Sequence, residues 1–234
     1  MFPEFLLLSQ IRSNNSFVIN QSKYTQSKTV VNLYSQNKSR KKQGNFRDML
    51  EALGERETGL ASGDSRQYKF VNPKLYFLGK YQFAEILLIR LGYYKAQVYF
   101  GNGADKNYWK GSWTGKNGIN SKAEFLNSPE TQEKAIREAF GVYWQDINYL
   151  MNKRGKSIES YLSQVKTFSE NGKSRTIKIT ISGIIAAAHL KGPGKVVDLL
   201  VSGRISQDPF GTSILEYLSE FGGYQTTPKD FLQP

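Results

Sequence analysis

The sequence predicts a mainly α-helical domain with long aromatic loops and at most a small β element, preceded by a disordered basic N-terminal tail. Apolar residues recur at helical spacing in several segments after residue 45. A strand-like alternation of β-branched residues is confined to 176–181. Residues 13–45 are rich in Asn, Gln, Ser and Lys and have too little apolar surface to fold alone. We therefore expect a tail at 1–45, a folded domain at 46–225 and a C-terminal tail at 226–234.

The helices of this domain are indicated by apolar spacing and by start signals. Ser128-Pro129-Glu130 combines a capping hydroxyl, a proline and an acid, which is typical of a helix start. Ser213 with Glu216 has the spacing of a capping box. The expected helices cover 46–57, 81–91, 129–151, 183–190, 195–202 and a last one from 213 to Gly222-Gly223, with a short helix near 158–165.

Composition excludes several classes of site. The chain of 234 residues has no cysteine and one histidine, His189. Structural disulfides and thiolate sites are therefore excluded, and a histidine-based metal site is disfavoured. We expect no cofactor and no metal. No apolar run approaches the roughly 20 residues of a membrane-spanning helix, and the apolar patch within 1–10 is too short for a secretory signal peptide.

The positive charge is shared between the tail and the domain. The net charge is +12. Residues 1–45 carry seven Lys and Arg against one Glu, which is 7 − 1 = +6, so the remaining residues carry 12 − 6 = +6. Such a chain suits an anionic polymer, whether nucleic acid, acidic lipid or a bacterial cell wall, and charge alone does not choose among them. The basic cluster at 38–42 fits either a nucleic-acid patch or a solvated linker.

Glu57 is the candidate for chemistry. On a helix it shares one face with Phe46, Leu50 and Leu53, because the spacings are four, three and four residues. A carboxyl group carried inward by this face would resist ionising, since desolvation disfavours its charged form. That environment suits a general acid near neutral pH. A helix ending at Gly59 would also allow Glu57 to point to solvent.

The region 93–127 is long, aromatic and interrupted by glycines. Loops of this length in a compact domain usually have a function. Its aromatic residues, Trp109 and Trp113 among them, suit either stacking on sugars or bases or a satellite core. We expect these two tryptophans to bind substrate.

Three segments, in order, resemble motifs of soluble lytic transglycosylases and goose-type lysozymes, over about 46–223. Arg56-Glu57-Thr58-Gly59 resembles the Glu-Ser motif that carries the acid. Gly79-Lys80-Tyr81-Gln82 resembles the Gly-Leu-Met-Gln segment. Residues 187–196 resemble the Ala-Tyr-Asn-Ala-Gly-Pro-Gly stretch, but His189-Leu190 stands where the family has Tyr-Asn. The loop between the first two motifs is longer than usual, and 94–127 matches no part of the pattern.

The resemblance implies a lysozyme-like fold whose sugar-binding cleft takes peptidoglycan glycan strands. The expected reaction is cleavage of the β-1,4 bond between N-acetylmuramic acid and N-acetylglucosamine, with Glu57 as acid and base. Gln82, Gly79 and Tyr81 are the expected substrate-binding residues, and His189 is either a polar substrate contact or a core histidine. Asp64 and Glu85 are read as structural or solvated, and Glu55 lies on another face of the helix. Such a protein acts in the cell envelope or after secretion, by a route that the sequence leaves open.

Two other functions remain open at this stage. The chain is alternatively a lysozyme-fold module that binds glycan without cutting it. It is also compatible with a nucleic-acid-binding protein that acts through its basic tail. The sequence decides neither between hydrolysis and anhydro-sugar formation nor the oligomeric state.

Overall fold

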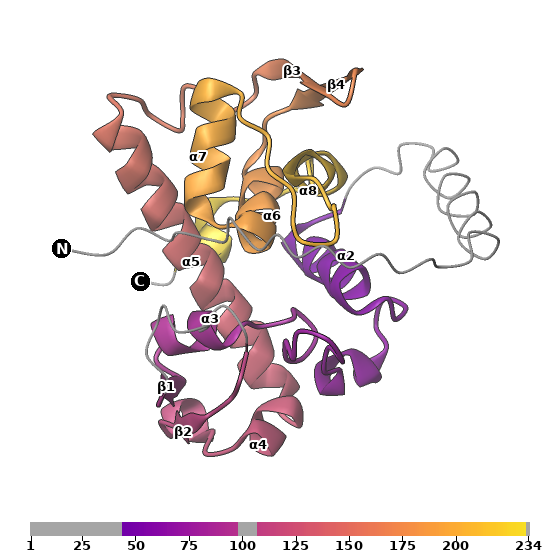
Figure 1. Ribbon diagram of the computed structural model, residues 1–234, viewed down its shortest axis with the longest axis vertical. Coiled ribbons are helices and arrows are strands. Elements are labelled where there is room, and N and C mark those ends of the chain that lie inside the picture. The colour runs from indigo at the N-terminus through magenta and orange to yellow at the C-terminus, as the bar shows by residue number, and fades with distance from the viewer. Residues whose placement is uncertain (1–43, 98–106, 233–234) are drawn as a thin grey trace, which may run out of the picture. The chain divides into compact units, whose positions relative to one another are not determined.

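The computed structural model describes residues 44–97 and 107–232, and this part of the chain is mainly α-helical (Figure 1). The mainly-α prediction is confirmed, and the β structure amounts to two small antiparallel hairpins. The α-helices are α2 (Phe46–Thr58), α3 (Glu85–Arg90), α4 (Lys122–Leu126), α5 (Pro129–Lys153), α6 (Ile181–Lys191), α7 (Pro193–Ser202) and α8 (Ile214–Glu220). The strands are β1 (Tyr94–Ala96), β2 (Gly111–Trp113), β3 (Val165–Glu170) and β4 (Lys173–Lys178). Short 3-10 helices are η1 (Ser65–Lys69), η2 (Lys116–Gly118) and η3 (Pro228–Asp230).

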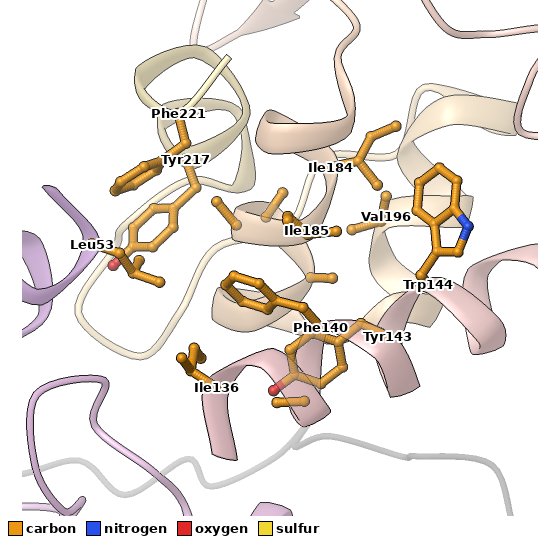
Figure 2. Packing of buried hydrophobic residues seen from close by; sticks show 14 of the residues in the cluster. Leu53, Ile136, Phe140, Tyr143, Trp144, Ile184, Ile185, Val196, Tyr217 and Phe221 are labelled. Atoms are coloured by element: carbon orange, nitrogen blue, oxygen red, sulfur yellow. The ribbon is translucent and has the colours of Figure 1, made fainter. Parts of the chain in front are cut away.

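The long helix α5 is the centre of the packing. One of its ends lies beside α6 and α7, and the other lies near α3, α4 and the β1–β2 hairpin (Figure 1). In Figure 2 the Phe140 ring of α5 lies near Ile185 of α6, whereas Trp144 of α5 lies on the side of Val196 of α7. The predicted start at Pro129 is confirmed, although the Ser128 hydroxyl donates to the Thr131 hydroxyl (2.8 Å) rather than accepting from the backbone.

Helix α2 is fixed at both ends by its own sequence. Asn45 Oδ1 accepts from the backbone N–H groups of Arg47 and Asp48, and Asp48 accepts from Asn45 N (2.7 Å), which completes a capping box. At the other end Gly59 adopts φ 70°, a left-handed conformation that suits glycine. The helix therefore ends one residue after Glu57, close to the predicted boundary.

Helix α6 is buried on nearly all sides, because α7 and α8 both pack on it. Its N-cap is Thr180, whose hydroxyl accepts from Gly183 N (3.2 Å), so the helix begins two residues before the predicted 183. A Cβ atom at Gly183 would lie 2.5 Å from the backbone oxygen of Leu218, so this glycine allows α8 to approach closely. Gly192, at φ 82°, separates α6 from α7.

Three sequence predictions differ from the structure. Residues 158–164 form turns instead of a helix, and the following strand β3 pairs with β4 through a tight turn at Asn171-Gly172. Helix α3 begins at Glu85 and not at Tyr81, because Gln82 takes φ 47° and interrupts the helix. The compact part also continues past residue 225, since Phe231 is buried against the rings of Phe46, Phe140 and Trp144.

The predicted tail at 1–45 lies, apart from Gly44 and Asn45, outside the described residues. Within the described residues, none of the helices combines the length and apolar character needed to cross a membrane.

Candidate functional site

The Glu57 carboxyl points inward and is held by α8. Its Oε1 accepts a hydrogen bond of 2.7 Å from the hydroxyl of Tyr217, and the Glu57 side chain is only 15% exposed. In Figure 2 the Tyr217 hydroxyl lies beside Leu53 of α2. The other oxygen, Oε2, accepts no hydrogen bond from the described residues. Of the two orientations that the sequence left open for Glu57, the structure has the inward one.

Burial raises the pKa of Glu57 above its ordinary value. His189, the Tyr217 hydroxyl and Arg56 act in the opposite direction, because each stabilises the carboxylate, while the negative charge of Asp208 raises the pKa further. The net shift is upward. The carboxyl group therefore keeps its proton at a higher pH than an exposed glutamic acid does.

His189 lies beside Glu57 but belongs to the core. Its Nε2 is 2.8 Å from the backbone oxygen of Tyr81 and 4.0 Å from Glu57 Oε1. A carbonyl oxygen only accepts hydrogen bonds, so Nε2 carries a hydrogen. The side chain is 5% exposed, Nδ1 is buried without a partner, and the rings of Phe140 and Tyr143 flank the imidazole. Of its two possible roles, His189 has the surroundings of a core histidine.

The expected substrate contacts at 79–82 are turned into the core. Tyr81 is completely buried and its hydroxyl donates to Glu133 Oε1 (2.5 Å), so its ring is out of reach of a ligand, which corrects the prediction. The Gln82 side chain is also buried, and its Nε2 donates to the backbone oxygen of Gly79 (2.8 Å). A Cβ atom at Gly79 would lie 2.1 Å from Gln132 Oε1. Gly79 also takes φ 73°, a left-handed conformation, so the fold itself favours glycine at this position.

Trp109 and Trp113 form a compact aromatic cluster with Tyr94. The two indole rings are stacked with centroids 6.1 Å apart, and Tyr94 meets each ring edge-on at 5.4 Å. Trp109 Nε1 donates to the backbone oxygen of Tyr76 (2.7 Å). Both tryptophans are half-buried against the core. Their packing is thus that of a satellite core, and each of the two tryptophans is still partly exposed to solvent.

Tyr217 and Arg56 lie at the candidate site, and the sequence analysis gave neither of them a role there. Arg56 pairs with Glu216 (3.1 Å) and Glu220 (3.7 Å) on α8, and its guanidinium lies 5.4 Å from the centre of the Tyr217 ring. The end of α2 is thereby tied to α8. The one relevant sequence signal was the capping box at the start of α8, which is present as predicted but says nothing about the partner helix.

The remaining acids named from the sequence have structural roles. Glu85 is buried and accepts from Trp109 N (2.6 Å), and Asp64 caps η1 and pairs with Arg66. Glu55 is exposed. Among the described residues, no group of three or more His, Asp or Glu is arranged to hold a metal ion. A cavity lined by Arg90, Lys116, Glu138 and Phe231, among others, includes none of the predicted site residues.

No protein-family model, curated protein or solved structure matches this chain. A single carboxyl group, desolvated and hydrogen-bonded through one oxygen, can donate a proton and then take one back.

Proposed function

We propose that this protein cleaves the glycan strands of peptidoglycan at the β-1,4 bond between N-acetylmuramic acid and N-acetylglucosamine, on a lysozyme-like fold. The observation that carries the proposal is the Glu57 carboxyl, buried at the end of α2, held by Tyr217 and raised in pKa. The order of the three motifs and the net charge of +12 also support it, since the cell wall is anionic. This activity implies a place in the cell envelope or outside the cell.

Glu57 would act in two proton transfers. In the first, the protonated carboxyl gives its proton to the glycosidic oxygen while the bond from that oxygen to the sugar carbon breaks and oxocarbenium character develops. In the second, the carboxylate accepts a proton from the incoming hydroxyl, which is water in a hydrolase or the muramyl 6-hydroxyl in a transglycosylase. Because Tyr217 occupies Oε1, Oε2 is the oxygen available for both transfers.

A single protein acid suffices for this chemistry. The N-acetyl group of the substrate can attack the sugar carbon and replace a second carboxylate. Glu85 and Asp64 are engaged in structural hydrogen bonds, and Asp208 accepts from the backbone of Phe210 and Thr212. These engagements favour the substrate-assisted route.

The test is release of muropeptides from purified sacculi, followed by mass spectrometry. We expect wild type to release fragments, and Glu57→Gln to lose at least about 100-fold in rate, as is usual when a general acid is removed. Glu55→Gln is the matched control, because Glu55 is exposed on the same helix. Absence of product with wild type, or equal release by Glu57→Gln, removes the proposal. Hydrolytic and anhydro products differ by the mass of one water, which settles the reaction type.

A second candidate is a module that binds glycan without cutting it. The observation that favours it is the inward orientation of Tyr81, Gln82 and His189, which leaves fewer polar groups to orient a sugar beside Glu57. Co-sedimentation with sacculi in the absence of any released fragment would support this candidate.

A further inference from the structure

A buried lysine lies between α2 and α5. The Lys80 side chain is 1% exposed, and its ammonium group contacts Glu51 Oε1 (2.6 Å), Glu133 Oε1 (2.9 Å) and the hydroxyl of Tyr68 (3.2 Å). Glu133 Oε1 also accepts from the hydroxyls of Tyr68 (2.8 Å) and Tyr81 (2.5 Å). We call these five residues the Lys80 network.

The Lys80 network joins separate elements at one point. Glu51 comes from α2, Glu133 from α5 and Tyr68 from η1. The backbone of Lys80 is fixed as well, because its N–H donates to Gln132 Oε1 of α5 (3.0 Å). The lysine stem crosses α2 at Gly54, where a Cβ atom would lie 2.6 Å from Lys80 Cε. The Lys80 side chain is buried, whereas those of Glu51 and Glu133 are 30% and 29% exposed. Such a cluster is a weak source of net stability, since desolvation of the ammonium group offsets the attraction. Its value to the protein is therefore the geometry that it fixes.

His189 and Glu57, the two neighbours at the candidate site, are both connected to this network. Tyr81 donates through its hydroxyl to Glu133 and accepts through its backbone oxygen from His189 Nε2 (2.8 Å). On the other side, α2 carries both Glu51 and Glu57, so the lysine also restrains the helix that holds the acid. Lys80 is thus connected to His189 through Glu133 and Tyr81, and to Glu57 through α2. The 4.0 Å separation between His189 Nε2 and Glu57 Oε1 depends on both connections.

We propose that the Lys80 network is a positioning device that, through Tyr81, holds the His189 imidazole with its Nε2–H directed at the Tyr81 carbonyl and beside Glu57. Lys80, Glu133 and Tyr81 are positioning residues in this scheme, because none of them touches the reacting atoms. A role of this network in catalysis rests on the proposed function of Glu57. Its role in holding His189 in place does not depend on that function.

The groups around the pair come from five parts of the chain. His189 faces Glu57 of α2, the Tyr143 ring of α5 and the Tyr81 carbonyl. The Glu57 carboxyl also faces the Tyr217 hydroxyl of α8, and the charges of its neighbour Arg56 and of Asp208, in the segment between α7 and α8, reach it. A change in the Lys80 network would move His189 relative to all of these groups.

Nuclear magnetic resonance tests the proposal directly, because His189 is the one histidine of the chain and gives one pair of imidazole ¹⁵N signals. We expect wild type to show a hydrogen on Nε2 that exchanges slowly with water. Glu133→Gln weakens the anchor of Tyr81, and we expect the exchange of this hydrogen to become about tenfold faster or more, with displaced ¹⁵N shifts, as for loss of a charged hydrogen bond.

Glu138→Gln is the matched control. Glu138 is on the same helix, pairs with Lys116 (2.7 Å) and has a similar side-chain exposure, 22% against 29% for Glu133, but does not contact Tyr81. In this variant we expect the Nε2 hydrogen of His189 to exchange at a rate within about twofold of wild type. This should hold even if the melting temperature falls as much as that of Glu133→Gln. A purely structural role for Glu133 predicts wild-type His189 signals in both variants, and that result overturns the proposal.

Two further outcomes keep the test decisive. If Glu133→Gln does not fold, Tyr81→Phe keeps the ring packing and removes only the hydroxyl, and unchanged His189 signals in that variant overturn the proposal. The readout needs no cleavage, so the two proposals can fail separately. Inactive wild-type protein with responsive His189 signals removes the function of Glu57 but keeps the positioning device. If wild type is active, we expect Glu133→Gln to lower kcat by about fivefold or more with KM nearly unchanged.

Discussion

Glu55 and Glu57 are close neighbours on α2 and lie in opposite environments. Glu55 is exposed, whereas the carboxyl of Glu57 is directed at Tyr217 and His189. The difference follows from helix geometry, since positions two apart point to different faces. A sequence pattern could therefore select Glu57 over Glu55, because only Glu57 continues the spacing of Leu50 and Leu53.

The raised pKa of Glu57 predicts a pH-dependent stability cost. Between the ordinary value of 4.5 and the higher folded pKa, the native state keeps a proton that the unfolded chain releases. Stability therefore falls as pH rises through this window, and the loss is fully present above it. Glu57→Gln cannot ionise and still offers an oxygen to Tyr217. We expect its melting temperature to exceed that of wild type at pH 7, by roughly 2–4 °C per kcal/mol for a chain of this size.

Calorimetry of both proteins from pH 4 to pH 8 measures this difference. The advantage of Glu57→Gln should shrink toward zero as pH falls below 4.5, where Glu57 is protonated in both states. Glu55→Gln should show no such trend. An advantage that is constant with pH would contradict an inward, proton-retaining Glu57.

Tyr217 is predicted to hold the Glu57 pKa below the value that burial alone would give. Its hydrogen bond to Oε1 stabilises the carboxylate, so Tyr217→Phe should raise the pKa of Glu57 further. If the protein cleaves glycan as proposed, the basic limb of its pH–rate profile should then shift upward. Loss of the bond should also cost about 1–3 kcal/mol of stability at pH 7. Tyr149→Phe is the control, because Tyr149 is 58% exposed on α5. An unshifted profile in Tyr217→Phe would exclude a direct effect on the acid.

Residue-level prediction from sequence failed where the partner is distant along the chain. Tyr217 is 160 residues from Glu57, and Glu133 is 52 residues from Tyr81. Spacing rules describe one element at a time, so they placed Glu57 on an inward face but could not say what it would meet. The motif resemblance implies a substrate role for Tyr81, but nothing local distinguishes a tyrosine that faces a ligand from one that faces a carboxylate of the protein.

At the scale of elements, the space around two helix glycines predicts that replacement by alanine has opposite effects on stability at the two positions. A Cβ atom at Gly183 of α6 would lie 2.5 Å from the backbone of α8, whereas a Cβ atom at Gly194 of α7 would enter open space. Gly183→Ala should therefore destabilise the protein by about 1–3 kcal/mol through overpacking. Gly194→Ala should stabilise it by about 0.4–1 kcal/mol, because alanine restricts the unfolded chain. Urea unfolding measures both, and a stable Gly183→Ala variant would contradict the close packing of α6 and α8.

Helices with strong local signals were predicted well, whereas only part of the β3–β4 hairpin was, since the predicted alternation at 176–181 overlaps β4 and nothing indicated β3. The start of α5 and the capping box of α8 follow from adjacent residues, which is why sequence alone located them. The β3–β4 hairpin buries few residues, Phe168 and Ile177 among them. Most of its side chains are polar, so its sequence lacks a clear alternation of apolar and polar residues. Its informative signal was Asn171-Gly172, a dipeptide that favours the turn of a two-residue hairpin.

At the scale of the whole molecule, the contacts of Gly44 and Asn45 determine where a minimal protein must begin. Gly44 O accepts from Gln225 N (2.9 Å), and Asn45 both caps α2 and bridges to Gln225. The chain divides into two units at this point, and the second begins at Gly44. How the helices pack could not be predicted from the motifs, because motif order does not specify helix packing.

Two truncations that differ by two residues test this boundary. A protein of residues 44–234 keeps the cap and should melt within about 2 °C of the full chain, whereas residues 46–234 lose the cap, at a cost of about 1 kcal/mol and roughly 2–4 °C.

Removing 1–43 also removes half of the net charge, since this segment holds +6 of +12. If cleavage depends on Glu57, residues 44–234 should still release muropeptides. The salt dependence of binding to DNA or sacculi should become shallower, because fewer counterions are released. Lost cleavage in a folded 44–234 protein would mean that the N-terminal segment contributes to the reaction, and a full loss of DNA binding with cleavage intact would assign nucleic-acid contacts to that segment alone.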